Sequence, residues 1–118
     1  MMRLTSDLWV KALIRRLYGA GDFAAVERVG AAEAGAVFVR VRRRDGVETL
    51  LAPAPQSLFE TARPEDRLFE TRVAVATAAE IDALLSREAS FDPDFWVVEI
   101  ETERPETYLD IMPAAPDD

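Results

Sequence analysis

Residues 36–44 alternate between two kinds of side chain, and no other part of the sequence limits the possible folds as strongly. Alternation at period two is the signature of a β-strand that buries one face. The dipeptide at 45–46, Asp-Gly, is typical of tight hairpin turns, and residues 47–52 resume an extended pattern. We therefore predict a β-hairpin. One face of its first strand would carry Val37, Val39 and Val41, and the other Phe38, Arg40, Arg42 and Arg44.

Two segments have the spacing of amphipathic helices. The first, residues 7–18, follows capping hydroxyls at positions 5 and 6, and its apolar side chains recur three and four residues apart. The second follows Thr77, whose partner Glu80 three residues later completes a capping box, and it ends before Pro93. We expect each helix to pack its apolar side against a sheet.

Three further segments, residues 22–29, 67–75 and 95–103, have the composition of strands. The prolines between residues 53 and 64 predict a long surface loop. In the last strand carboxylates occupy every second position, as guanidinium groups do in the first hairpin strand. Opposite charges across a strand pair stabilise it by roughly 0.2–1 kcal/mol each, so we predict that these strands are neighbours. The facing rows would be Arg40, Arg42 and Arg44 on one strand and Glu99, Glu101 and Glu103 on the other.

Together these elements predict a single α+β domain of order α-β-β-β-β-α-β, with a largely antiparallel sheet of about five strands. Both helices would pack on one face of it. The domain would span residues 1–103, and residues 104–118 would form an acidic, proline-containing tail. Phe38, Phe95 and Val97 then fall on the charged side, where a partner protein would have to cover them. The expected core is Trp9, Leu13, Leu17, Val37, Val39, Val41, Leu84, Leu85, Trp96, Val98 and Ile100.

The residue types that are missing remove most familiar chemistry. The chain has 0 Cys and 0 His, which excludes disulfides, thiolate nucleophiles, zinc sites with sulfur or nitrogen ligands and imidazole-based triads. No phosphate-binding or dinucleotide-binding glycine motif occurs. Asp92 and Asp94 are better explained by a turn than by a cation site. We predict no catalytic residue, no metal site and no cofactor.

The distribution of charge and apolarity indicates a cytoplasmic protein with no membrane partner. Charged residues interrupt the apolar N-terminal stretch, and no run approaches the roughly 20 apolar residues that a membrane-spanning helix requires. Basic residues concentrate before position 46 and acidic ones after it, in a chain of net charge −8. Such asymmetry is typical of a nucleic-acid patch, of an acidic interaction tail, or of two halves of one domain that neutralise each other on folding.

Two groups of residues are candidates for partner contacts. Phe38, Arg40, Arg42 and Arg44 form a mixed aromatic and basic row on the hairpin. Tyr108, Leu109, Ile111 and Met112 form an apolar patch between acidic residues in the tail. This patch either docks on another surface or packs back on its own domain, and the sequence leaves both open.

Three stretches together resemble a known family. These are SDLWVKALIRR at 6–16, AGAVFVRV at 34–41 and DPDFWVVEIE at 92–101. The chain is similar over residues 1–103 to the small alphaproteobacterial family called domain of unknown function 1491. The resemblance implies a compact cytoplasmic domain and no catalytic or binding residues.

The leading functional hypothesis is a non-catalytic protein–protein interaction module or accessory subunit, with self-association left open. The alternative is a small enzyme or ligand-binding protein that uses carboxylate and Arg groups in a pocket beside the proline-rich loop. Nucleic-acid binding through residues 40–44 comes third, because a net charge of −8 and a pI near 4.6 oppose it. A flat face with exposed aromatics would favour the first hypothesis, and a pocket with converging charges the second.

Overall fold

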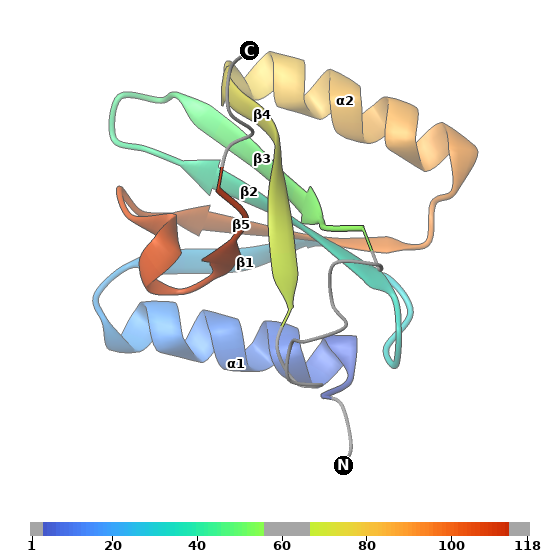
Figure 1. Ribbon diagram of the computed structural model, residues 1–118, viewed down its shortest axis with the longest axis horizontal. Helices are drawn as coiled ribbons and strands as arrows, with labels where there is room; N and C mark the ends of the chain where they lie inside the picture. The colour runs from blue at the N-terminus through green and yellow to red at the C-terminus, as the bar shows by residue number, and fades with distance from the viewer. Residues whose placement is uncertain (1–3, 56–66, 114–118) are drawn as a thin grey trace.

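The computed structural model describes residues 4–55 and 67–113 (Figure 1). Most of the long loop predicted after residue 53 lies outside these described residues. The elements are α1 (Ser6–Gly19), β1 (Phe23–Arg28), β2 (Ala36–Arg42), β3 (Glu48–Pro53), β4 (Leu68–Ala76), α2 (Ala78–Phe91), β5 (Phe95–Glu101), a 3-10 turn η2 (Pro105–Thr107) and β6 (Asp110–Ile111). The predicted order of helices and strands is confirmed as far as β5, and the α+β class with it.

The strands form a mixed sheet, and the prediction of a largely antiparallel sheet of about five strands is wrong. Six strands lie in the order β1-β5-β2-β3-β4-β6, and β5 runs parallel to β2. The physical reason is α2, because a helix that returns the chain across a sheet places the next strand parallel to the one before the helix. The sixth strand, β6, runs parallel to the start of β4 and has only two residues.

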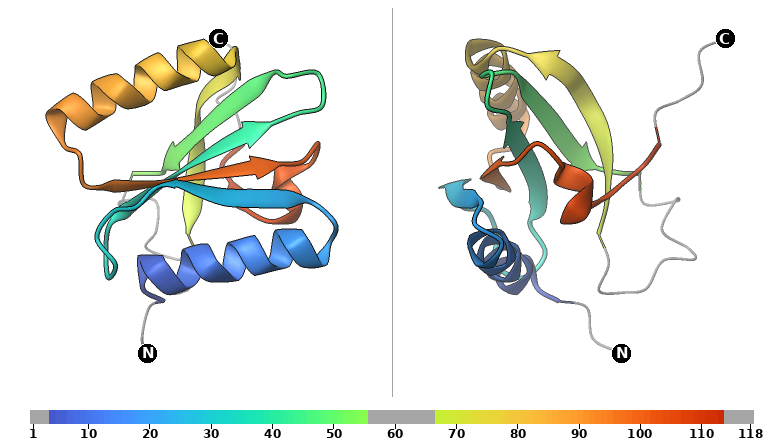
Figure 2. Two further views of the ribbon diagram at one scale, coloured as in Figure 1. Left: turned by 180° about the vertical axis from the view of Figure 1, so that it is seen from behind. Right: turned by 90° about the vertical axis from the view of Figure 1, so that its left-hand side faces the viewer.

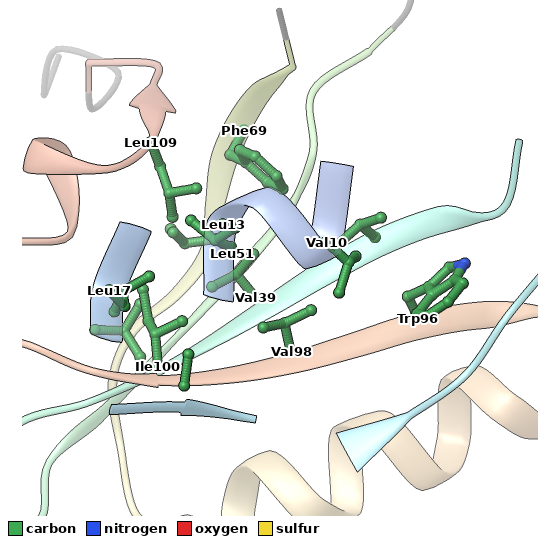
Figure 3. Close-up of a cluster of buried hydrophobic side chains, with 13 residues drawn as sticks. Val10, Leu13, Leu17, Val39, Leu51, Phe69, Trp96, Val98, Ile100 and Leu109 are labelled. Carbon is green, nitrogen blue, oxygen red and sulfur yellow. The ribbon is translucent and has the colours of Figure 1, made fainter. Parts of the chain in front are cut away.

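The two helices cover opposite faces of the sheet, so the prediction that they share one face is also wrong (Figure 2). Helix α1 packs its apolar side on alternate residues of β2 and β5, among them Val39 and Val98 (Figure 3). Helix α2 packs Ile81 and Leu85 on the intervening residues. Those residues include Phe38, Phe95 and Val97, so α2 covers the apolar side chains for which a partner protein was predicted.

Local interactions explain where the two helices begin and where the hairpin turns. The Thr5 hydroxyl accepts a hydrogen bond from the Leu8 N–H, which caps α1. The predicted capping box of α2 is present, with Thr77 and Glu80 each accepting from the other's backbone N–H. Gly46 has φ +86°, the left-handed conformation that the hairpin turn needs and that glycine adopts without strain. These short-range signals make the element boundaries readable from sequence.

The described part of the C-terminal segment packs back on the domain. Arg16 of α1 donates hydrogen bonds to the Thr107 and Tyr108 carbonyls, and the Tyr108 hydroxyl donates to Asp22 at 2.8 Å. Leu109 enters the core beside α1 and is 5% exposed. Of the two arrangements that the sequence left open for this patch, the structure has the docked one.

Candidate functional site

The sheet face under α2 changes from apolar to charged along its length. At the apolar end, Phe38 and Phe95 lie beneath α2. Further along the same two strands come Arg40 opposite Glu99 and then Arg42 opposite Glu101, which is exposed. The charged end therefore lies beyond the apolar part that α2 covers.

Arg40 is the centre of a buried ion network. Its side chain is 5% exposed and that of its partner Glu48 is 0% exposed. Arg40 Nε donates to Glu48, and Nη1 donates to Asp82 at 2.7 Å and to Glu27 at 3.1 Å. Nη2 donates to the Ala78 carbonyl at 3.0 Å. Because Ala78 and Asp82 belong to α2, the network ties this helix to the sheet.

Burial and pairing act in opposite directions on Arg40. Burial favours the neutral form, but hydrogen bonds to Glu48 and Asp82 and the attraction of Glu27 outweigh it and raise the pKa of Arg40. The guanidinium is therefore a permanent buried cation whose donors are directed at its own domain. Arg40 was predicted as a partner contact, and in this structure its guanidinium is buried with its hydrogen bonds directed at Glu48, Asp82, Glu27 and the Ala78 carbonyl.

The predicted pairing of the basic and acidic strands is confirmed, although the ion pairs are shifted by one position. In the parallel register Arg40 lies opposite Glu99 and Arg42 opposite Glu101. The Arg42 guanidinium instead bonds to Glu99 at 2.8 Å and to Glu48 at 2.9 Å. The hydrogen bond to Glu48, partly offset by burial, raises the pKa of Arg42. Arg42 remains 38% exposed, so it links the buried network to the surface.

A shallow hollow of about 250 Å³ lies at the charged end. Three chain segments line it, at residues 21–23, 42–44 and 101–103. Arg44 is exposed on this wall, and its backbone N–H donates to the Glu103 carboxylate at 2.8 Å. The hollow thus brings three guanidinium-bearing residues against carboxylates of β5 and the segment after it.

Two exposed aromatic side chains stand beside this hollow. Phe23 is 40% exposed and lines it, and Tyr18 is 55% exposed. Their ring centroids are 6.0 Å apart in an edge-to-face arrangement. Neither residue was among the predicted contact residues, although Tyr18 follows the polar residues Lys11 and Arg15 at helical spacing. We call Tyr18, Phe23, Arg42, Arg44 and Glu101 the contact surface.

A second hollow of about 490 Å³ lies at the other end of the sheet. It is lined by the residues before α1, by residues 33–37, and by the end of β3 and the start of β4. Arg67 is in its wall, where the guanidinium donates to the Ser6 hydroxyl at 3.1 Å and lies 5.5 Å from the Trp9 ring centroid. The volume falls within the range of small-molecule sites.

The other predicted contact residues are partly used by the fold. Phe38 is 7% exposed under α2, and Leu109 is buried beside α1. Tyr108, Ile111 and Met112 are half-buried. Of the eight predicted contact residues, Arg44 and Arg42 are the ones that the contact surface contains.

Residues 4–55 and 67–113 contain neither a cluster of metal ligands nor a membrane-spanning helix. In these ranges no three carboxylate side chains come together in a way that could hold a metal ion. Neither α-helix in these ranges has the length and apolarity that crossing a bilayer requires.

Comparison with known proteins places the chain among relatives of known structure. The family described as "Protein of unknown function (DUF1491)" matches residues 4–110. The solution structure of the protein Atu0922 from A. tumefaciens is similar with 53% identity and a TM-score of 0.82, over 97% of this chain and 100% of that chain. The crystal structure of a family protein from Caulobacter crescentus is similar with 38% identity and a TM-score of 0.75, over 95% and 100% of the two chains. No curated protein matches.

Proposed function

The chain belongs to the DUF1491 family, whose function is unknown, and we propose that it acts as a non-catalytic protein–protein interaction module. The observation that carries this proposal is the exposed Tyr18–Phe23 ring pair beside a charged hollow at one end of the sheet. Tyrosine and arginine are enriched among the residues that dominate binding energies at protein interfaces. A shallow mixed-charge hollow with an aromatic ring pair at its edge suits a protein surface better than a reacting small molecule.

The ion network supports this role because it holds the contact surface in place. Arg42 is held by two ion pairs, with the buried Glu48 at 2.9 Å and with Glu99 at 2.8 Å. Side chains that are ordered before binding lose less conformational entropy when a partner docks. A partner would therefore meet a preorganised surface with Arg44 and Glu101 as its adjustable charges.

The proposal is tested by placing a photoreactive amino acid at position 23 of the full chain in cells of the organism that encodes it. The matched control carries the same group at Phe91, which is 82% exposed at the end of α2 and lies outside the contact surface. We expect a discrete protein adduct from position 23 that Arg44→Glu reduces at least threefold. Equal adducts from the two positions, or none from position 23, would refute the proposal.

A second candidate function, small-molecule binding, is supported by the hollow of about 490 Å³ near Pro53 and Arg67. Glu33 and Arg67 line it together with apolar side chains, which suits a small molecule with both polar and apolar parts. A fragment screen followed by amide chemical shifts tests this candidate. Binding should shift the amides of residues 33–37 and 67–69 together while leaving those of the contact surface unchanged.

Nucleic-acid binding through residues 40–44 is the weakest of the three. Arg40 is buried and Arg42 is engaged by two carboxylates, so the run of basic residues presents fewer guanidinium groups than its sequence indicates. The remaining positive charge also lies beside Glu101 and Glu103, which would repel phosphates.

A further inference from the structure

We propose that the outer side of α1 binds an α-helix of a partner protein, and that this helix presents acidic side chains to Lys11 and Arg15. The inference rests on the proposed function, because it names the kind of partner element that an interaction module of this shape would bind. It adds a second surface, which meets the contact surface at Tyr18.

The outer side of α1 carries a regular stripe of exposed side chains. Leu8 is 52% exposed, the Lys11 side chain 63% and Tyr18 55%, and Arg15 is exposed between them. These residues are spaced three, four and three positions apart, so they lie above one another on one side of the helix. The buried residues Ser6, Val10, Leu13 and Leu17 occupy the opposite side. Figures 1 and 2 show α1 along one rim of the molecule, with its far side away from the sheet.

The stripe has the composition of a helix–helix contact. Two apolar side chains, Leu8 and Tyr18, stand at its ends and two cations at its centre. Alternate three-residue and four-residue spacing is the pattern by which side chains of one helix fit between those of another. A partner helix would therefore place apolar residues over Leu8 and Tyr18 and carboxylates over Lys11 and Arg15.

The charges of α1 favour an acidic occupant. Among the residues that the structure describes, Arg15 has no ion pair, and Lys11 has one, with the half-buried Asp7 at 3.1 Å. Arg16 is different, because the Thr107 and Tyr108 carbonyls already hold it. At physiological ionic strength the screening length is about 8 Å, so these local cations outweigh the distant negative charges of the chain.

Charge also excludes two other occupants. A second copy packed through the same stripe would bring Lys11 and Arg15 of both helices to the centre of the contact, where like charges repel. A membrane surface does not suit the stripe either, because the stripe has cations where a lipid-facing helix has its apolar centre. An acidic helix meets neither obstacle.

The stripe continues into the contact surface. Tyr18 ends the stripe, and its ring touches that of Phe23 with centroids 6.0 Å apart. One partner can therefore lay a helix along α1 and extend its flanking residues over the charged hollow. This continuity is the reason to assign both surfaces to the same partner.

The experiment places the photoreactive amino acid at position 8 of the full chain in the encoding organism, again with position 91 as the control. The adduct is digested and the attached segment is identified by mass spectrometry. We expect a segment with acidic and apolar residues at helical spacing. The corresponding synthetic peptide is then titrated into the purified full chain by calorimetry.

The titration is repeated with Lys11→Glu/Arg15→Glu and with the control Arg87→Glu, an exposed cation on α2. The double variant should weaken binding at least tenfold, and a peptide with lysines in place of its acidic residues should restore it. The Arg87 control should bind within twofold of the unchanged chain. Circular dichroism of each variant confirms that α1 is folded.

Several results would overturn the inference. They are an adduct from position 8 only to lipid or to a second copy, a segment without acidic helical spacing, and a charge reversal that changes affinity less than twofold. If position 23 gives a protein adduct while position 8 gives none above the control, the helix inference fails and the proposed function stands. If neither position gives an adduct, both fail.

Discussion

Replacing Arg40 with methionine tests the ion network beneath α2 most directly. The substitution keeps an unbranched side chain of similar length and removes the guanidinium that bonds to Glu48, Asp82, Glu27 and the Ala78 carbonyl. Water cannot replace these bonds at Glu48, whose side chain is 0% exposed. Removing the buried partner of a carboxylate strongly destabilises the folded state, because the remaining charge is buried without compensation.

The expected loss can be estimated from the exposure of each partner. Removal of one member of a buried ion pair costs about 3–5 kcal/mol. Glu27 and Asp82 are 38% and 66% exposed and become hydrated, and Glu48 keeps its bond to Arg42 at 2.9 Å. We therefore expect the free energy of unfolding to fall by about 3 kcal/mol, the lower end of that range. For a domain of this size the melting temperature should fall by roughly 10–15 °C.

The assay is urea unfolding followed by the fluorescence of Trp9 and Trp96, with Arg44→Met as the control. That control removes an exposed guanidinium and should change the free energy of unfolding by less than about 0.5 kcal/mol. The double variant Arg40→Met/Glu48→Met removes both buried charges and should be less destabilised than the sum of its single variants. A free energy of unfolding for Arg40→Met within about 1 kcal/mol of the unchanged chain would refute the reasoning.

Three further predictions follow from local geometry. Gly30→Ala should destabilise the fold by about 2 kcal/mol in thermal melts, because its Cβ would lie 2.7 Å from the backbone of β5; Gly19→Ala, with nothing within 4 Å, should not. A double-mutant cycle should give Arg42 and Glu99 a coupling of about 0.5–1 kcal/mol, and strictly additive losses would contradict their contact at 2.8 Å. The hydrogen bond to its aspartate acceptor raises the pKa of Tyr108. The hydrogen bond should therefore stabilise the folded protein fully below about pH 10, the pKa of tyrosine in an unfolded chain. This stabilisation should be lost as the pH rises through the higher pKa that Tyr108 has in the folded protein. Ultraviolet titration measures the pKa of Tyr108, and a value at or below that of an ordinary tyrosine would contradict the hydrogen bond.

The elements were predictable because their signals are short-range. The Thr77–Glu80 capping box and the Gly46 turn involve residues a few positions apart, so the sequence contains the whole interaction. Periodicity also indicated correctly which residues share a face of β2. It could not indicate which helix covers each face, because both faces carry apolar side chains and either can accept a helix.

The same limit applies to the site. The matching rows of charge predicted that β2 and β5 are neighbours, which is confirmed. The role of Arg40 could not be predicted, because Glu27 and Asp82 come from β1 and α2, elements whose positions depend on tertiary packing. Strand β6 was missed because its two residues carry no periodicity and are held by a hydrogen bond from the Met112 N–H to the Phe69 carbonyl.

The place of β5 between β1 and β2 has a consequence for synthesis on the ribosome. Residues 95–101 are made after every other strand except β6, yet both β1 and β2 need them as a neighbour. Until these residues have left the ribosome, the nascent chain therefore exposes two strand edges without partners. Such edges are templates for aggregation. The sheet can close only once translation of the domain is nearly finished, and until then chaperones and proteases have access to its interior.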